Sequence, residues 1–487
     1  MKNIRRTLAG LSALAVSLSI TACSSTTEES PAGTTASEAV ATAETTTAAT
    51  VEINTETVRE EEQAAVDSAA SKLRDIELEN KEIKWLCHWD LNPDTTGKSM
   101  PIPLNLFQTK YGGSIKWYPT TWNTRYSDLS TYVLGGEGID YFQRDNESLP
   151  KGIVSGMFEP IDEYIDIDSE LYDNVRSGME YYNFGGKHYA FVNSVKADGA
   201  CIYSIQTIEE HGFDDPWELY QEGNWNWDTF EQMLIEYCDP DAEQYGLDGW
   251  WSEQPLYLSA GTPAISAGPD GMQVNLTDPN LEKAQNFMYD LYTKGLVFDK
   301  SLFDWSIQVQ NMGEGKELFF IGGTYQLQSD PSTWECQIPP EDVRWVPVPG
   351  PKDGDTYYAA SASGYCLCKG ASNPLGVALY VECELVAGSD EETRAQNEQK
   401  QRDDFQWTDI VIEQAREIDK VAAEHPVIEM AGGISSDLTN LLTYADTEGL
   451  KASMHGTDWP STRDSLNDTV IMLVDEFNEQ LNTAINS

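Results

Sequence analysis

Strand-like and helix-like segments alternate in the first part of the folded body. Residues 82–89 and 114–118 predict strands, because apolar and polar side chains partly alternate there and aromatic residues are frequent. Residues 104–111 and 125–134 have apolar positions at helical spacing, and each segment ends at a pair of glycines. With a third short strand at 139–142, this order predicts an α/β fold with a parallel sheet.

The rest of the chain continues this mixture. We expect amphipathic helices over 228–238, 281–294 and 470–481. We expect short strands over 316–321, 343–348 and 364–368. The first of these helices has a suitable N-terminus, because Asn226 or Asp228 can accept a backbone N–H and Glu231 suits the positive end of the helix dipole. We assign these residues a structural role.

The N-terminal residues differ in composition from the rest. A basic start precedes an apolar run over 8–20 and then Thr-Ala-Cys23, a pattern typical of a secretion signal whose cysteine carries lipid in bacterial lipoproteins. We expect a lipoprotein signal peptide over 1–22, lipidation at Cys23 and a flexible tether over 23–80. The tether follows from the Ser, Thr, Ala and Glu of residues 24–66, which include few large apolar side chains.

Charge narrows the class of partner. The chain has 487 residues with 81 acidic and 31 basic side chains, a formal net charge of −50. A nucleic-acid partner is therefore not expected, because binding phosphate requires a basic surface. The same charge argues against electrostatic docking on anionic lipid, so we expect membrane contact through the lipid anchor alone.

No residue pattern predicts a metal or cofactor site. The seven cysteines after Cys23 are odd in number and irregularly spaced, so they define no disulfide framework and are expected to be small buried side chains. The five histidines have no zinc-type spacing. Residues 96–99 resemble part of a phosphate loop, but Asn92 replaces a required glycine. Residues 90–94 resemble the start of a calcium loop that lacks its later ligands.

Catalytic signatures are also missing, which favours a binding function. The chain has no G-x-S-x-G motif. A pair of carboxylates could still form a glycosidase site, and with 81 acidic residues this alternative stays open.

Tryptophan is the chemically distinctive residue. Several of the 14 tryptophans lie beside polar residues in predicted loops, as at Trp122 and Trp250-Trp251. Sugars pack their C–H faces on indole rings and bind Asp, Asn and Arg through their hydroxyl groups, so this pattern favours a carbohydrate ligand. Other tryptophans are expected to be structural, namely Trp85, Trp117, Trp217 and Trp345.

A series of short motifs resembles one known family. These motifs lie at 185–191 (GGKHYAF), 201–204, 208–216, 226–230, 314–325 and 369–374. In their order and spacing they resemble the bacterial extracellular solute-binding proteins (sugar type, family 1), which are lipoproteins of ABC importers. The resemblance covers about residues 81–485. One departure is that Val192-Asn193 stand where the family often has proline, which affects the expected hinge.

The resemblance implies a periplasmic-binding-protein-like α/β fold of two lobes, with crossing hinge strands and a ligand cleft between the lobes. Lobe one would hold 81–195 and 346–388, and lobe two 196–345 and 389–487. The chain would cross near 191–200 and 343–350, and again after Ala387. Ligands of open α/β sheets lie beyond the carboxyl ends of strands.

This logic selects residues at strand ends, at helix starts and where the chain re-enters lobe one. The candidate ligand-binding residues are Trp89, Asp90, Trp122, Arg125, Asp140, Trp250, Trp251, Tyr325, Tyr358, Ser361, Ser363, Trp459 and Arg463.

The expected function is that of a receptor without catalysis. The resemblance implies a lipid-anchored monomer on the outer face of the bacterial cytoplasmic membrane that binds a sugar, most simply an oligosaccharide, and delivers it to an ABC permease. The alternatives are a secreted glycoside hydrolase or lyase and a binding protein for a peptide or another solute.

Overall fold

The computed structural model describes residues 58–93, 100–268, 271–300, 306–444 and 447–486. The expected signal peptide, the lipidated Cys23 and most of the tether lie outside the described residues. Helix α1 (Glu60–Ala69) follows, with Val66 and Ala69 fully buried, and it packs on α2 and α12. The packed body therefore includes residues before Lys81, where the sequence suggested that it starts.

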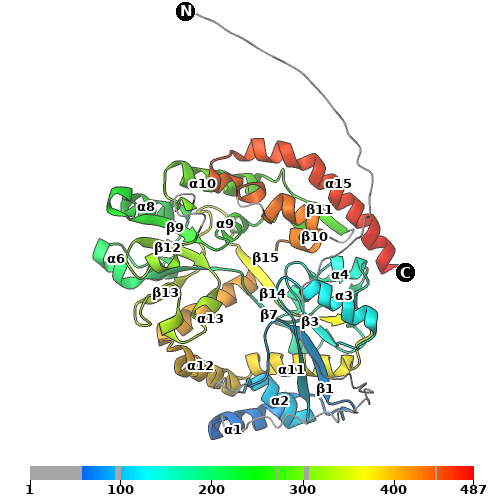
Figure 1. The fold of residues 1–487 in the computed structure, drawn as a ribbon. Helices are drawn as coiled ribbons and strands as arrows, with labels where there is room; N and C mark the ends of the chain where they lie inside the picture. Colours follow the sequence, from blue (N-terminus) through cyan, green and yellow to red (C-terminus); the bar gives the residue numbers. More distant parts are fainter. Residues whose placement is uncertain (1–57, 94–99, 269–270, 301–305, 445–446, 487) are drawn as a thin grey trace, which may run out of the picture. The chain divides into compact units, whose positions relative to one another are not determined.

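A seven-stranded sheet organises one half of this body (Figure 1). Its first three strands are parallel neighbours in the order β3-β1-β2, with Trp85 beside both Trp117 and Tyr141. The predicted strand, helix, strand, helix, strand order is thus confirmed. The strands of this sheet are β1 (Glu82–Cys87), β2 (Ser114–Pro119), β3 (Tyr141–Gln143), β4 (Phe158–Glu159), β7 (Phe191–Ala197), β14 (Tyr358–Cys368) and β15 (Pro426–Val427).

Helices cover this sheet and bury their apolar faces against it. Helix α11 is apolar almost all round and packs on α2, β1, β7 and β14. Helices α2 and α3 end at the left-handed glycines Gly112 and Gly136, as the glycine pairs predicted. The helices of this half are α2 (Ile102–Tyr111), α3 (Arg125–Gly135), α4 (Lys151–Val154), α5 (Arg176–Glu180), α11 (Pro374–Ser389) and α12 (Glu391–Phe405).

A four-stranded sheet organises the other half, in the order β13-β8-β12-β9. All six residues of β12 are buried, and after Glu317 its residues 318–322 form an apolar run. Before α8, the Asn226 side chain accepts the backbone N–H of Asp228 and Thr229, so Asn226 is the cap. The elements here are β8 (Ala200–Ser204), β9 (Tyr245–Gly249), β12 (Glu317–Gly322), β13 (Val343–Val346), α6 (Ile205–His211), α7 (Pro216–Gln221), α8 (Trp227–Tyr237), α9 (Glu253–Leu258) and α10 (Pro279–Thr293).

The chain passes between the two sheets at two places, and the first of them borders the cleft described below. It leaves the first sheet at the end of β7 and enters the second at β8, with only Asp198 and Gly199 between them. It returns through residues 347–357, between β13 and β14. Helix α13 (Asp409–Glu424) packs on β7, β13 and β14, and so contacts strands of both sheets.

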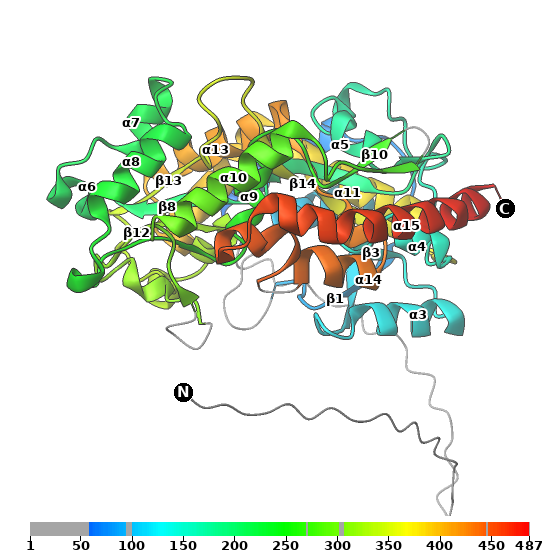
Figure 2. The same cartoon turned by 90° about the horizontal axis from the view of Figure 1, so that it is seen from above.

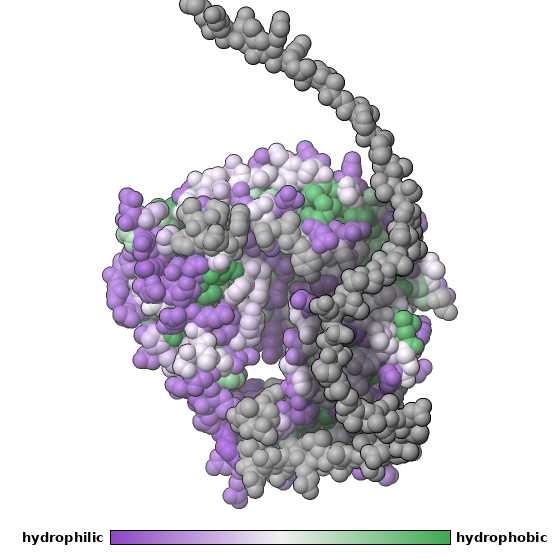
Figure 3. All heavy atoms as spheres, in the orientation of Figure 1, coloured by the Kyte–Doolittle hydropathy of each residue, from purple (hydrophilic) through white to green (hydrophobic). Residues whose placement is uncertain are grey.

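The C-terminal helix α15 (Trp459–Ile485) also contacts both halves (Figure 2). It packs on α10 and on β11 (Gly271–Val274), which pairs with β10 (Ile265–Gly268), and further along on α4. In the described part of the chain no helix is long and apolar enough to cross a membrane. Hydrophilic side chains cover much of the face seen in Figure 3.

Candidate ligand-binding cleft

A cleft of about 520 Å³ is lined by residues that the two crossings bring together. One wall comes from the start of α3, the segment after β3 and the middle of β14. The other wall comes from α9 and the segments η10 (Asn440–Tyr444) and η11 (Gly449–His455). Asp198, in the turn between β7 and β8, also lines the cleft.

Two indole rings line the cleft on different elements. Trp122, 50% exposed, precedes α3, and the Arg125 guanidinium lies over it with Cζ 3.7 Å from the ring centroid. Trp251 follows β9 and stacks on Tyr325, with centroids 6.2 Å apart and planes 19° apart. Aromatic faces beside polar groups suit a ligand that has both C–H faces and hydroxyl groups.

Arg125 is held in a buried ion-pair network. Its Nε donates to Asp145 at 2.7 Å and its Nη2 donates to Glu147 at 3.0 Å. The hydroxyl of Tyr126 donates to the same Asp145 carboxylate. These bonds satisfy the guanidinium within the protein, so its role in the cleft is to support Trp122 and fix the wall.

Three further carboxylates, Asp198, Glu253 and Glu429, line the cleft and differ in their partners. Glu253 lies 3.8 Å from Nε2 of His455. Glu429 accepts the backbone N–H groups of Ala264, Ile265 and Ala431 and the hydroxyl of Tyr257. Asp198 accepts a 2.8 Å bond from the Gln254 side chain. Burial raises the pKa of Asp198 to about 6. Asp198 is therefore mostly an ionised acceptor at neutral pH and becomes a hydrogen-bond donor as the pH falls below about 6.

Arg144 also lines the cleft. It is 6% exposed, its Nη2 donates to Ser361 at 2.6 Å, and its guanidinium lies 5.3 Å from the centroid of the Tyr182 ring. Its Nε is buried and has no hydrogen-bond partner in the described part of the protein.

The structure brings some of the predicted residues to the cleft. Those that line it are Trp122, Arg125, Trp251, Ser361 and Ser363. Tyr325 is 58% exposed and lies beside the cleft through its stack on Trp251. Trp89 is half-buried against Trp85 and contacts His88, whose ring in turn contacts Trp122.

The structure places other predicted residues away from the cleft lining, for local reasons. Asp140 is fully buried and accepts the backbone N–H groups of Lys84 and Asn373, so it joins β1 to the start of α11. Trp459 is fully buried at the start of α15, and Arg463 on the same helix pairs with Glu282 and Asp464.

Three more predicted residues lie outside the cleft lining. The Asp90 carboxylate accepts the backbone and side-chain N–H groups of Asn92. Tyr358 lines a separate small cavity, which also borders α13. Trp250 is 43% exposed, and its indole N–H faces the side chain of Gln326.

Sequence reasoning missed several residues of the cleft. Arg144 directly follows β3, so its place beyond the carboxyl end of a parallel strand could have selected it. Asp198 lies in the crossing that the resemblance implied at 191–200. No local pattern marks Gln254, Glu429 or Lys451, because segments distant in sequence bring them to the cleft.

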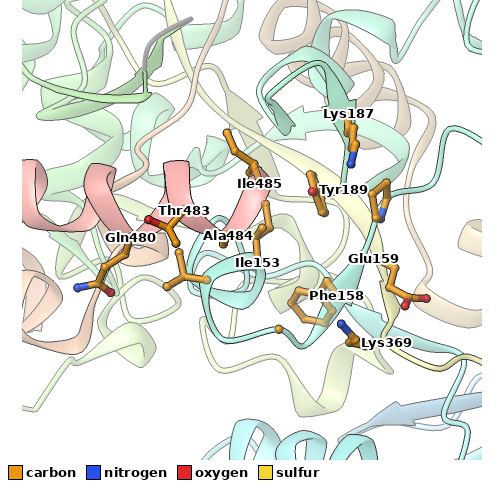
Figure 4. A pocket seen from close by; sticks show the side chains of 13 residues that line it. Ile153, Phe158, Glu159, Lys187, Tyr189, Lys369, Gln480, Thr483, Ala484 and Ile485 are labelled. Carbon is orange, nitrogen blue, oxygen red and sulfur yellow. The ribbon is translucent and has the colours of Figure 1, made fainter. Parts of the chain in front are cut away.

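A second hollow, of about 640 Å³, lies elsewhere in the body (Figure 4). Figure 4 shows Ile485 of α15 near Ile153 and Phe158, with Lys187, Lys369 and Glu159 around them. It shares no lining residue with the cleft and contains none of the predicted site residues. We therefore take the cleft as the candidate site. The described residues include no group of three His, Cys, Asp or Glu suited to a metal ion.

Comparison with known proteins gives the fold and a partial sequence match. No family model matches the chain. Over 205 residues it is 22% identical to the maltotriose-binding protein of Pyrococcus abyssi, and the match spans only 41% of the length of each protein.

Solved structures match over a larger share. The galacto-N-biose/lacto-N-biose I-binding protein of an ABC transporter from Bifidobacterium longum, in complex with lacto-N-biose, is 13% identical with a TM-score of 0.57, covering 83% of this chain and 99% of that chain. A Mycobacterium tuberculosis protein in complex with glycerophosphocholine is 16% identical with a TM-score of 0.55, covering 77% and 94%. The chain therefore has the two-lobe α/β fold of periplasmic binding proteins, which confirms the predicted fold class.

Proposed function

We propose that this protein is the substrate-binding receptor of an ABC importer and that it binds a carbohydrate in the cleft. The observation that carries the proposal is the cleft itself, in which Trp122 and Trp251 lie on separate elements among hydrogen-bonding side chains. The maltotriose-binding and lacto-N-biose-binding names of the similar proteins support a sugar as the ligand.

The binding mechanism follows from the two crossings. A sugar that contacts both walls stabilises the arrangement in which both walls reach it, which is the closed one. Binding therefore shifts the equilibrium between open and closed lobes toward closure. The indole faces would bind the C–H faces of the sugar, and Ser361, Ser363 and Gln254 would bind its hydroxyl groups. The ligand leaves chemically unchanged.

The direct test is a thermal-shift and calorimetric screen with the purified protein. A ligand at 100 times its Kd stabilises a protein by about 2.7 kcal/mol, which shifts the melting temperature by several degrees. We expect at least one di- to hexasaccharide to produce such a shift. A broad panel of sugars that leaves the melting temperature unchanged, while a peptide or polyol raises it, would contradict the carbohydrate assignment.

Because carboxylates line the cleft, a glycoside hydrolase is the alternative function to test. Glu429 directs its oxygens at three backbone N–H groups and a tyrosine hydroxyl, an arrangement that holds a carboxylate in place rather than freeing it for catalysis. Incubation of each bound sugar with the protein, followed by chromatography, separates the two functions. Recovery of intact sugar supports the receptor, and cleavage supports the hydrolase.

Cellular location and partners form the last part of the proposal. Lipid on Cys23 would hold the protein at the outer face of the membrane, next to the transmembrane subunits of its permease. We expect a Cys23→Ala variant to be released into the medium of the producing bacterium, and membrane retention equal to that of the wild type would count against the anchor. Size-exclusion chromatography with light scattering tests the expected monomer.

A further inference from the structure

The cleft contains one buried cation without a counter-ion. Arg144 is 6% exposed, and in the described part of the chain no carboxylate oxygen lies within 4.0 Å of its guanidinium nitrogens. Its only side-chain hydrogen bond there goes to the neutral hydroxyl of Ser361. A buried charge that lacks a partner is costly, so such a group is normally paired or functional.

Arg125 shows how the same cleft treats a guanidinium with a structural role. The side chain of Arg125 is 7% exposed, close to the exposure of Arg144, yet it binds Asp145 and Glu147 directly. Both arginines line one wall. One arginine of this wall therefore has carboxylate partners, and the other, Arg144, has none.

Nearby acidic groups do not replace that partner. Asp145 and Glu147 are engaged by Arg125, and Glu429 is held by backbone N–H groups. Asp198 is the remaining carboxylate that interacts with Arg144, but burial outweighs this attraction and raises the pKa of Asp198 to about 6. Asp198 is therefore mostly ionised at neutral pH, but it lies more than 4.0 Å from the guanidinium nitrogens and forms no direct ion pair with Arg144.

The chemistry of the empty position is that of an oxyanion. A guanidinium presents N–H groups in a planar fork, which matches the two oxygens of a carboxylate or phosphate. Ser361 accepts one N–H of Nη2, and Nη1 makes no hydrogen bond in the described residues, so the Nη1–Nη2 edge of the guanidinium still has N–H groups to donate, whereas Nε is enclosed by protein. On the opposite wall, Lys451 adds a second positive charge; in the same described residues no carboxylate lies within 4.0 Å of it, although it interacts at longer range with the buried Glu253.

We propose that Arg144 binds an anionic oxygen group of the ligand, so that the cleft prefers acidic carbohydrates to neutral ones. The inference rests on the proposed carbohydrate function and deepens it by naming the ligand class. The anionic group is a carboxylate, as in a uronic acid, or a phosphate ester. Arg144 provides both a positive charge and two directed donors, which a hydroxyl group cannot fully use.

The test compares ligands that differ only in charge. Isothermal titration at pH 7.5 would use hexuronate di- and trisaccharides, the same sugars with each carboxylate reduced to an alcohol, and a separate set of sugar phosphates. We expect the wild type to bind one acidic set at least tenfold more tightly than its neutral counterparts. Arg144→Gln should weaken acidic binding at least tenfold and neutral binding less than threefold.

Control variants separate this effect from folding and from net charge. Arg463→Gln also removes one positive charge but lies outside the cleft, and it should change neither affinity by more than twofold. Circular dichroism verifies the fold of each variant. If Arg144→Gln does not fold, Arg144→Lys should keep the charge but lose the fork, and should reduce the preference without reversing it.

The outcomes distinguish the two proposals. Neutral and acidic sugars of equal affinity in the wild type, or equal losses for both in Arg144→Gln, would overturn the anion site and leave the sugar receptor standing. Binding limited to phosphate or carboxylate compounds that are not sugars, with dependence on Arg144, would overturn the carbohydrate function and support the anion site. No binding in any set would overturn both.

Discussion

The indole nitrogen of Trp251 donates a 2.9 Å hydrogen bond to the main-chain carbonyl of Asp198. Asp198 lies in the two-residue turn where the chain passes from β7 to β8, and its own N–H donates to the Ala359 carbonyl of β14. An aromatic wall of the cleft is therefore attached directly to a crossing of the chain. We therefore expect a shift at the crossing to change the direction of this indole.

Removal of the Trp251 ring should weaken sugar binding more than removal of its neighbour. Trp251 lines the cleft, whereas Trp250 is exposed but lies outside the lining. We expect Trp251→Ala to lower affinity at least tenfold and Trp250→Ala less than threefold, because only the first variant removes a stacking face. Calorimetric titration of both variants with the sugar found in the screen measures the difference. Equal losses would show that Trp251 has no special role.

Substitution of Arg125 should lower the free energy of unfolding, because this side chain belongs to a buried ion-pair network. The effect can be measured in the absence of ligand. Arg125→Met leaves the buried Asp145 without its cation, while Glu147 keeps its 3.3 Å ion pair with Lys151, so we expect a loss of about 3 kcal/mol in the free energy of unfolding. The matched control is Lys352→Met, because Lys352 and Asp228 are 62% and 68% exposed, and we expect a change within about 0.5 kcal/mol.

Urea denaturation monitored by circular dichroism gives both values. A second substitution, Asp145→Asn, should recover part of the loss in Arg125→Met, because it removes the unpaired charge. Additive losses in the double variant would argue against a direct ion pair.

The buried carboxyl group of Glu384 should make the free energy of unfolding depend on pH. This carboxyl accepts hydrogen bonds from Asn193 at 2.8 Å and from Tyr365 at 2.6 Å, and burial raises its pKa from 4.5 to about 7. Between these values the folded protein holds a proton that the unfolded chain has lost. The contribution of Glu384 to stability is therefore complete below pH 4.5 and decreases as pH rises toward 7.

A variant isolates this contribution from that of other acids. Glu384→Gln cannot ionise, so the stability of the wild type relative to this variant should fall as pH rises across that window, by at most about 1.4 kcal/mol per pH unit. Denaturation series at pH 4.5, 5.5, 6.5 and 7.5 provide the comparison. A constant difference at all four pH values would refute the assignment.

The sequence pattern predicted those helices and strands in which buried apolar residues recur at regular spacing. Strand β1 and helix α8 were recognised because apolar periodicity and an Asn226 cap define them locally. Strand β14 was recognised only over 364–368, although it begins at Tyr358. Its first residues are small and partly polar and pair with β7, so long-range pairing rather than an apolar run makes them a strand.

The same limit applies to the site. A tryptophan beside polar residues led to Trp122 and Trp251, which line the cleft, but also to Trp459, which is fully buried. The pattern is similar in each case, and only the packing of distant helices decides which ring is covered. Arg144 and Glu429 reach the cleft from segments without an aromatic motif, so the sequence alone did not group them.

The seven cysteines of the described residues are all free, and six of them are buried. Burial raises the pKa of these thiols, as it does to about 11 even for the less enclosed Cys238, so a maleimide reagent meets little reactive thiolate while the fold is intact. No disulfide has to form for the described residues to reach this fold, and reductant should leave the melting temperature unchanged. Folding of this part of the chain therefore needs no oxidising catalyst, and its natural thiols can report the rate of unfolding without an added labelling site.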